Sequence, residues 1–230
     1  MNRFLIFGPY RSRTTLIQRI INLSYPKLIS LGESSILLYK FFELSKTILE
    51  SPFEKLSIET IKNTDDFQPW TSFYSSTEIN QFYTSFANLF LDKLMIKDNF
   101  EWCGLKEVSI STDFFIPCFK YFFNQLNFKK IIFVKRNPQD ILVSRINAPW
   151  ASDEMKELSW QNEELKKIHL EISLQEEVQK ILGSDNVLII NTDNIDPNYL
   201  MHSLDQLFHM NGDLGIIQNI LSNKLGSSFN

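Results

Sequence analysis

The sequence has few of the residues from which metal centres and disulfide frameworks are built. Its 230 residues include two cysteines and three histidines. Cys103 and Cys118 do not form a CxxC pair, and this pattern disfavours both a zinc cluster and a disulfide framework. We therefore expect no metal site and a reducing, cytoplasmic environment.

An excess of one charge is also missing. The 23 Lys and Arg residues against 27 Asp and Glu residues give a net charge of −4, so no global basic field favours nucleic acid or an anionic membrane as a partner. The apolar start is interrupted by Gly8, Pro9 and Arg11 before it reaches the length of a signal sequence or a membrane span. No repeat, low-complexity tract or flexible linker divides the chain, and we expect one domain over residues 1–230. The sequence leaves the oligomeric state open.

Apolar and aromatic residues are abundant, with 43% hydrophobic residues and 20 Phe. Short β-type runs alternate with helical periodicity, which predicts an α/β fold, a three-layer sandwich around a central parallel sheet. Strands are expected at residues 3–7, 27–31, 102–106, 130–134 and 187–190. Helices are expected at residues 14–22, 34–50, 77–95, 114–125, 140–146, 163–182 and 199–209, and their aromatic stripes are expected to face the core.

The first strand ends in the segment Gly8-Pro-Tyr-Arg-Ser-Arg-Thr-Thr15. Aligned with the phosphate-binding pattern GxxxxGK[ST], Gly8 and Thr15 fit, whereas Arg13 replaces the second glycine and Thr14 replaces the lysine. Arg11 supplies a cation three residues before that lysine position. Because ligands collect where strands end and helices begin, this segment is a candidate anion site.

A second segment, Arg136-Asn-Pro-Gln-Asp-Ile-Leu-Val-Ser144, follows the buried strand at residues 130–134. The guanidinium of Arg136 offers a planar fork to a phosphate, and Ser144 adds a hydroxyl two turns later. Taken alone, Arg136 could be a surface ion-pair partner and Ser144 a solvent-facing residue. The pairing of this segment with the first favours a ligand that carries two phosphate groups.

Both segments resemble motifs of the sulfotransferases that use 3′-phosphoadenosine-5′-phosphosulfate (PAPS). The first is similar to the family's Pro-[Lys/Arg]-Ser-Gly-Thr-Thr-Leu loop and the second to its Arg-[Asn/Asp]-Pro-x-Asp-x-x-x-Ser segment, and the resemblance extends over residues 3–209. It implies a P-loop NTPase-like sulfotransferase fold of the bacterial small-molecule-tailoring type, with PAPS as cofactor and 3′,5′-ADP as product. In this resemblance Arg136 and Ser144 hold the 3′-phosphate. The 5′ end is held by Arg11, Ser12, Arg13, Thr14 and Thr15.

The resemblance also suggests catalytic residues. Arg11 would neutralise charge on the transferring group, Glu33 would be the general base for a hydroxyl or amine acceptor, and Lys106 would orient the sulfonate or the acceptor. Glu33 is equally consistent with a first-turn residue that favours the helix dipole. A lysine in this position is more often an ordinary solvated residue, and Lys106 is consistent with that interpretation.

Arg13 departs from the family pattern. A side chain does not take a positive φ cheaply, so either the backbone is compatible with it and Arg13 adds a second cation, or binding is impaired. The alternatives are therefore a P-loop kinase-like phosphotransferase that uses ATP, disfavoured by the missing lysine, and a catalytically inactive nucleotide-binding protein.

The acceptor is expected to be a small molecule. Four acidic residues lie in segments that could border the site, and they would suit a cationic acceptor such as a saxitoxin-type alkaloid, although charged loops are usually just solvated. These residues are Glu33, Asp113, Asp153 and Glu154.

Overall fold

The computed structural model describes residues 2–33, 37–51, 54–55, 71–72, 74–95, 99–107 and 110–223. The chain forms two compact units, one made of Met1–Ile36 with Met95–Asn230 and the other of Leu37–Leu94. The prediction of a single domain stays a prediction. No described helix combines the length and apolarity that crossing a membrane requires.

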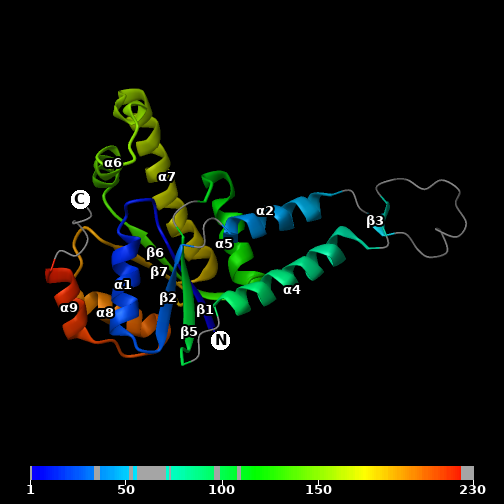
Figure 1. The fold of residues 1–230 in the computed structure, drawn as a ribbon, viewed down its shortest axis with the longest axis horizontal. Coiled ribbons are helices and arrows are strands. Elements are labelled where there is room, and N and C mark those ends of the chain that lie inside the picture. The colour runs from blue at the N-terminus through cyan, green and yellow to red at the C-terminus, as the bar shows by residue number, and fades with distance from the viewer. Residues whose placement is uncertain are drawn as a thin grey trace, which may run out of the picture. The chain divides into compact units, whose positions relative to one another are not determined.

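The larger unit is built on a five-stranded sheet with the strand order β2-β5-β1-β6-β7, seen in Figure 1. Every neighbouring pair in this sheet is parallel. The strands are β1 (Asn2–Phe7), β2 (Leu28–Glu33), β5 (Trp102–Glu107), β6 (Phe128–Lys135) and β7 (Val187–Asn191). Because all five run in one direction, their carboxyl ends share one edge.

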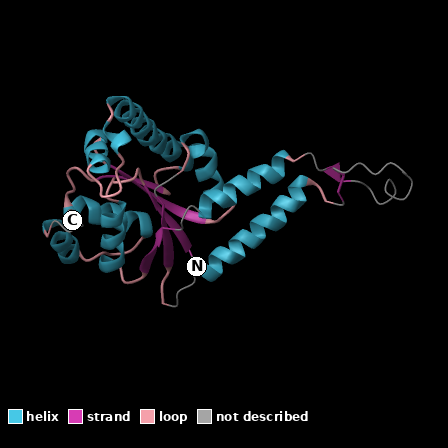
Figure 2. Ribbon diagram, turned by 45° about the horizontal axis from the view of Figure 1, so that its top comes forward, coloured by secondary structure: helices cyan, strands magenta, loops and turns pink. Residues whose placement is uncertain are grey.

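Helices cover both faces of this sheet, as Figure 2 shows. On one face lie α1 (Thr14–Ser24), α8 (Pro197–Phe208) and α9 (Leu214–Ser222). On the other lie α5 (Phe115–Asn124), α6 (Pro138–Ile146) and α7 (Leu158–Leu182). Two short 3₁₀ helices, η1 (Thr112–Phe114) and η2 (Asp153–Lys156), precede α5 and α7. The predicted α/β sandwich with a central parallel sheet is confirmed.

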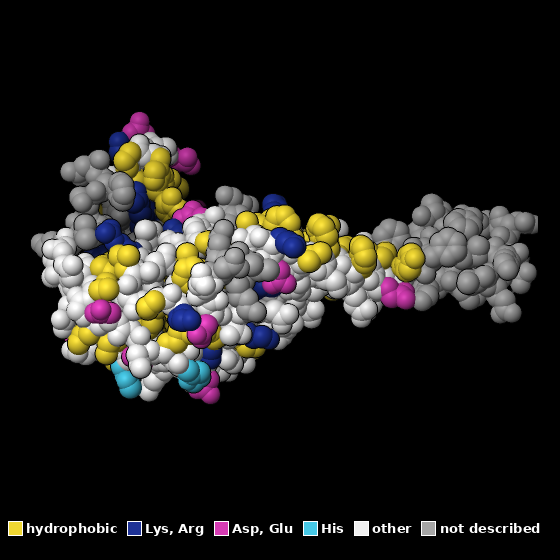
Figure 3. Space-filling view, turned by 60° about the horizontal axis from the view of Figure 1, so that its bottom comes forward, with side chains coloured by type: hydrophobic (Ala, Val, Ile, Leu, Met, Phe, Trp, Pro, Cys, Tyr) yellow, Lys and Arg dark blue, Asp and Glu magenta, His cyan; other side chains and the backbone are white. Residues whose placement is uncertain are grey.

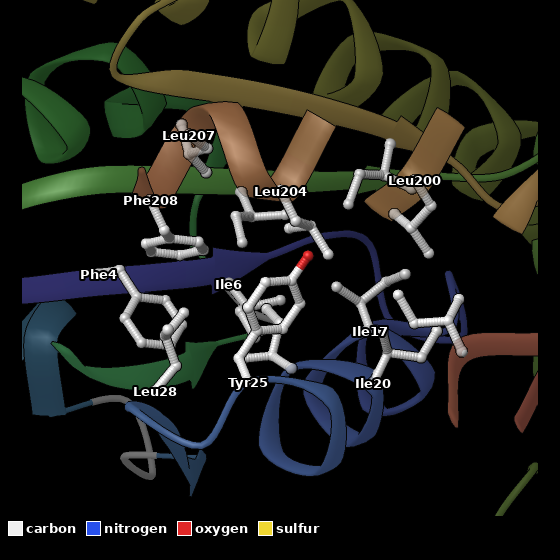
Figure 4. Packing of buried hydrophobic residues seen from close by; sticks show 14 of the residues in the cluster. Phe4, Ile6, Ile17, Ile20, Tyr25, Leu28, Leu200, Leu204, Leu207 and Phe208 are labelled. Carbon is white, nitrogen blue, oxygen red and sulfur yellow. The ribbon is translucent and has the colours of Figure 1, made fainter. Parts of the chain in front are cut away.

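Side chains of β1 pack against the helices on each face of the sheet, because successive strand residues point to opposite faces. Phe4 and Ile6 pack with residues of α1 and α8, as Figure 4 shows, and the Phe4 and Phe208 ring centroids are 5.1 Å apart. Phe7 faces the other way, with its ring centroid 5.2 Å from that of Phe119. Burying each such side chain contributes roughly 1.5–3 kcal/mol, so β1 is fixed from both sides and the segment that follows it starts from a rigid base.

The predicted elements of this unit occur, with some changes of extent. β2 continues to Glu33, two residues beyond the predicted end, and α7 begins at Leu158 rather than at residue 163. The helix α9 was not predicted. Its start is marked by Asp213, whose side chain accepts a hydrogen bond from the Ile216 backbone N–H. Aspartate is a normal N-cap residue, but Gly215 in the first turn has a low helix propensity and weakens the sequence signal.

The smaller unit contains α2 (Leu37–Glu50) and α4 (Ser76–Met95), with a parallel pair of two-residue strands, β3 (Glu54–Lys55) and β4 (Thr71–Ser72). The helices pack through Phe41, whose ring centroid lies 6.2 Å from that of Tyr83 and 6.0 Å from that of Phe90. The Ser45 hydroxyl is 2.7 Å from Asn80 Oδ1.

The inward face of α4 differs from the prediction. The aromatic stripe was expected to face a core, yet Phe82 is 79% exposed and Phe86 55% exposed. The buried α4 residues are instead small or aliphatic, among them Thr84, Ala87 and Leu91. Two α4 rings, those of Tyr83 and Phe90, do contact Phe41 of α2, so only part of the aromatic content of α4 faces outward.

Candidate functional site

The chain diverges at the carboxyl ends of β1 and β6, which are neighbours in the sheet. From β1 it passes through α1 to β2 on one side, and from β6 through α6 and α7 to β7 on the other. Such a switch point leaves a crevice between the departing loops and is the usual ligand site of an open parallel sheet. The two sequence motifs follow these two strands.

The first loop, residues 8–13, is tightly packed. A Cβ at Gly8 would lie 2.4 Å from the Val134 carbonyl oxygen and 2.5 Å from Ser12 Oγ, so only glycine fits. Ser12 is fully buried, its backbone N–H donates to the Pro9 carbonyl at 2.9 Å, and its Oγ has no hydrogen-bond partner among the described residues. A buried hydroxyl without a partner at the start of α1 is a donor available to an anion.

Arg13 does adopt the conformation that the family pattern assigns to glycine. Its φ is 71°, and Arg11 has a φ of 75°, so two side-chain-bearing residues of this loop lie in the left-handed region. The Arg13 side chain is anchored, because its Nη1 donates to the Thr192 carbonyl at 2.7 Å. The backbone is thus compatible with a side chain, at the cost of local strain.

Thr192 links the first loop to the sheet. It is buried after β7, and its Oγ1 lies 3.1 Å from the Ser12 carbonyl oxygen and 3.2 Å from that of Lys135. The role of Thr192 as the contact between the ends of β6, β7 and the first loop needed the strand order to be known.

Charged groups of both segments act on Arg13. Burial first and the Arg136 charge second lower the pKa of Arg13, while the carboxylates of Asp193 and Asp140 oppose this shift. The side chain of Arg136 is 17% exposed, with Nη2 3.4 Å from Asp140 Oδ2 and Nε 3.9 Å from Asp193 Oδ1. Arginine side chains beside a helix start make a position where an anion would be stabilised, in exchange for the contacts with these two carboxylates.

The second segment has the predicted strand, loop and helix context. Asn137 caps α6, since its Oδ1 accepts from the Gln139 backbone N–H at 2.9 Å, and Pro138 occupies the first turn. Asp193 accepts from the Asn137 backbone N–H at 2.8 Å. Ser144 is half-buried two turns into α6, and its part in binding stays a prediction.

Glu33 and Lys106 come together at the ends of β2 and β5. Lys106 Nζ lies 2.7 Å from Glu33 Oε1 and 3.2 Å from Thr15 Oγ1. The Lys106 side chain is 9% exposed and that of Glu33 43% exposed. The lysine is therefore no ordinary solvated residue, and it brings a cation to the first turn of α1.

Arg11 lies against an aromatic pair. Its Cζ is 5.8 Å from the centroid of the Trp150 ring, a cation–π distance, and the Trp150 and Tyr10 ring centroids are 5.5 Å apart. Arg145 of α6 donates from Nε to the Tyr10 carbonyl at 3.1 Å. The sequence motifs include Arg11 but neither Trp150 nor Arg145, because a lone tryptophan and a lone arginine carry no motif.

Arg145 also pairs with Glu164 of α7, and Glu171 lies in the same charged group. Burial raises the pKa of Glu171 to about 8, with Arg145 opposing this shift and Glu164 adding to it. The first loop is thus held to α7 through Arg145.

Two hollows border the site residues. One of about 430 Å³ is lined by Thr15 together with Gln18, Arg19, Asn22 and Leu23 of α1. The other, of about 490 Å³, lies along β7 and includes Lys135 and Asn191. Neither is lined by the arginines of the crevice. Each has the size of a small-molecule pocket.

The strain at Arg13 predicts a difference between two truncations. Arg13→Gly and Arg13→Ala both remove the contact with Thr192, but only Gly relieves the positive φ. We expect Arg13→Gly to be more stable than Arg13→Ala by about 1 kcal/mol, or roughly 2–4 °C in Tm. Thermal unfolding of the two variants measures this difference, and equal Tm values would contradict it.

The raised pKa of Glu171 predicts a pH-dependent gain from Glu171→Gln. A carboxyl whose folded pKa exceeds its unfolded value stabilises the fold at low pH, and this contribution is lost as pH rises from about 4.5 to about 8. Glu171→Gln should therefore match the wild type near pH 4 and be more stable above pH 8 by at least ~1 kcal/mol. Denaturant unfolding at both pH values tests this, and a pH-independent difference would refute it.

No protein-family model matches the chain, and no curated protein matches it in sequence. Among solved structures it is similar to shikimate kinase from Bacteroides thetaiotaomicron, with 11% identity, a TM-score of 0.44 and coverage of 91% of this chain and 99% of that one. It is also similar to the tunicamycin resistance protein of Deinococcus radiodurans, with 9% identity, a TM-score of 0.40 and coverage of 92% and 97%. At these values neither likeness carries an argument about chemistry, which rests on the residues above.

Proposed function

We propose that this chain is a sulfotransferase that transfers the sulfuryl group of PAPS to a hydroxyl or amine of a small acceptor. The observation that carries this proposal is a pair of candidate anion sites at neighbouring strand ends, the first loop after β1 and Arg136 after β6. A nucleotide with phosphate groups at both its 5′ and 3′ positions would engage both sites. A nucleoside triphosphate would engage the first alone.

The residues present fit such a nucleotide. On the 5′ side the first loop offers the unpaired Ser12 hydroxyl, the first-turn hydroxyls Thr14 and Thr15, and the free amides of α1. On the 3′ side the Arg136 guanidinium is largely shielded from water, which strengthens its attraction for a phosphate. Asp140 and Asp193 offset part of its charge, so binding there would exchange carboxylate contacts for phosphate contacts.

When bound, PAPS supplies an activated sulfuryl group. The chain's own residues would position that group and stabilise charge, which is the main requirement of in-line transfer of this kind. We assign charge neutralisation to Arg11 and Lys106, the cations contributed by the first loop and by β5. Lys106 already reaches the hydroxyl of Thr15.

Glu33 is the proposed general base. Its ion pair with Lys106 leaves the carboxylate 43% exposed at the end of β2, so it is held in place and is still accessible to an acceptor. Two of the four acidic residues that suggested a cationic acceptor already face cations of the chain, Glu33 facing Lys106 and Asp153 facing Lys156 at 2.7 Å. They give little support to a cationic acceptor, and the proposal extends only to a small one.

A kinase-like phosphotransferase is the second candidate. It is favoured by Lys106, because an ammonium 3.2 Å from Thr15 Oγ1 could replace the lysine that the first loop lacks. A catalytically inactive nucleotide-binding protein would use the same contacts without turnover. Nucleotide selectivity and turnover separate the three.

Calorimetry tests the nucleotide. We expect 3′,5′-ADP to bind more tightly than ATP with Mg²⁺, and Arg136→Ala to weaken 3′,5′-ADP by about 10- to 100-fold, since a hydrogen bond to a charged group contributes about 1.5–3 kcal/mol. Binding of 5′-AMP should stay unchanged in this variant. Lys129→Ala, at the opposite end of β6, is the matched control. Tight ATP binding with no preference for a 3′-phosphate would favour the kinase.

Glu33→Gln tests the base. Transfer from PAPS should fall by about 10²–10⁴-fold while 3′,5′-ADP affinity is retained. Glu101→Gln is the control, since Glu101 pairs with Lys27 at 3.7 Å immediately before β5 and should leave turnover unchanged. Unchanged turnover in Glu33→Gln would remove Glu33 from the mechanism. If the wild type transferred sulfate to no acceptor, the catalytically inactive nucleotide-binding protein would be favoured instead.

A further inference from the structure

The helix α4 has a second apolar face, opposite the one that packs on α2. Its exposed side chains include Phe82, Phe86 and Leu89, which are 79%, 55% and 58% exposed. At 3.6 residues per turn these three fall within an arc of about 60°, so they form one continuous strip, called here the outer stripe. Figure 3 shows apolar side chains following one another along the smaller unit, which contains α2 and α4. A helix that is apolar on two faces is normally covered on both.

The charged residues of α4 lie near its two ends, and residues 79–91 include none. Glu78 lies in the first turn, where its Oε2 also accepts hydrogen bonds from the Ser75 backbone N–H and hydroxyl. The last turn holds Lys93 and also Asp92, which projects to the side of the stripe, about 80° from Phe82. On the helix Glu78 and Lys93 project within about 40° of Phe82, in line with the stripe. The face therefore has an acidic start, an apolar middle and a basic end.

We infer that the outer stripe is where two copies of this chain pair, with their α4 helices antiparallel. A two-fold axis between residues 85 and 86 places Phe82 of one copy opposite Leu89 of the other and brings the two Phe86 side chains together. The same register places each Glu78 opposite Lys93 of the second copy. Parallel pairing would instead align like charges at both ends, which is unfavourable.

The exposed area sets the strength of this pairing. A large side chain has an area of ~200 Å². At their exposed fractions the three residues of the stripe leave roughly 400 Å² exposed per copy, or roughly 800 Å² over two copies. Stable specific complexes bury about 1,200 Å² or more. The dimer is therefore weak and forms reversibly at micromolar or higher concentration. This inference does not depend on the proposed function.

Analytical ultracentrifugation of the full chain across micromolar concentrations tests the pairing. The average mass should rise from 27.0 kDa towards twice that value as concentration increases. Phe86→Glu places two carboxylates together at the axis and should keep the protein monomeric at every concentration. Leu170→Glu changes a residue of α7 that is 47% exposed and should dimerise as the wild type does. A wild type that stays monomeric, or a Phe86→Glu variant that still dimerises, would overturn the inference.

Cysteine cross-linking tests the register without removing any apolar residue. Ser85→Cys lies beside the axis and should form a disulfide-linked dimer under mild oxidation. Gln81→Cys, also exposed, should not, because antiparallel pairing separates its two copies by more than about 10 Å along the helices. The native Cys103 and Cys118 are buried, which keeps the background low. Cross-linking of Gln81→Cys in place of Ser85→Cys would exclude this register.

Discussion

The parallel arrangement of all five strands is the constraint on which the candidate site depends. Parallel strands bring their carboxyl ends to one edge, and each strand here ends in a residue of the site. Glu33 ends β2, Lys106 lies near the end of β5 and Arg136 follows β6. The first loop follows β1, and Thr192 follows β7. Segments that are far apart in the sequence thus meet because the sheet allows no other arrangement.

Within this edge, charge is concentrated where the strand order reverses. Arg13 is held in a left-handed conformation, which costs free energy for a residue with a side chain. Hydrogen bonding to Thr192 offsets part of this cost. Backbone strain at one point beside charged side chains is typical of binding sites rather than of surfaces that serve only stability.

The sequence predicted the sheet and the two motifs because both depend on local patterns. β-type runs followed by helical periodicity mark strand ends, and Gly8 and Arg136 stand directly after two of them. Contacts that depend on which strands are neighbours could not be predicted, and Thr192, Trp150 and Arg145 belong to this class. Each is a single residue without a motif, and its partner is remote in the sequence.

The same limit explains the error on α4. Periodicity predicted an amphipathic helix correctly, but α4 has two apolar stripes, and periodicity does not say which one faces α2. The larger residues were expected inside because they gain more from burial. The inward face instead combines small and aliphatic side chains with the rings of Tyr83 and Phe90, which contact Phe41 of α2.

The hydrogen bond from Thr192 to the Ser12 carbonyl joins residues separated by 180 positions. A contact of such long range forms late, because the intervening chain must first be ordered. The first loop comes before β7 in the sequence, yet its final conformation depends on β7. Formation of a competent site therefore reports that the whole sheet has folded, and a chain that ended before β7 would contain both motifs without the geometry that joins them.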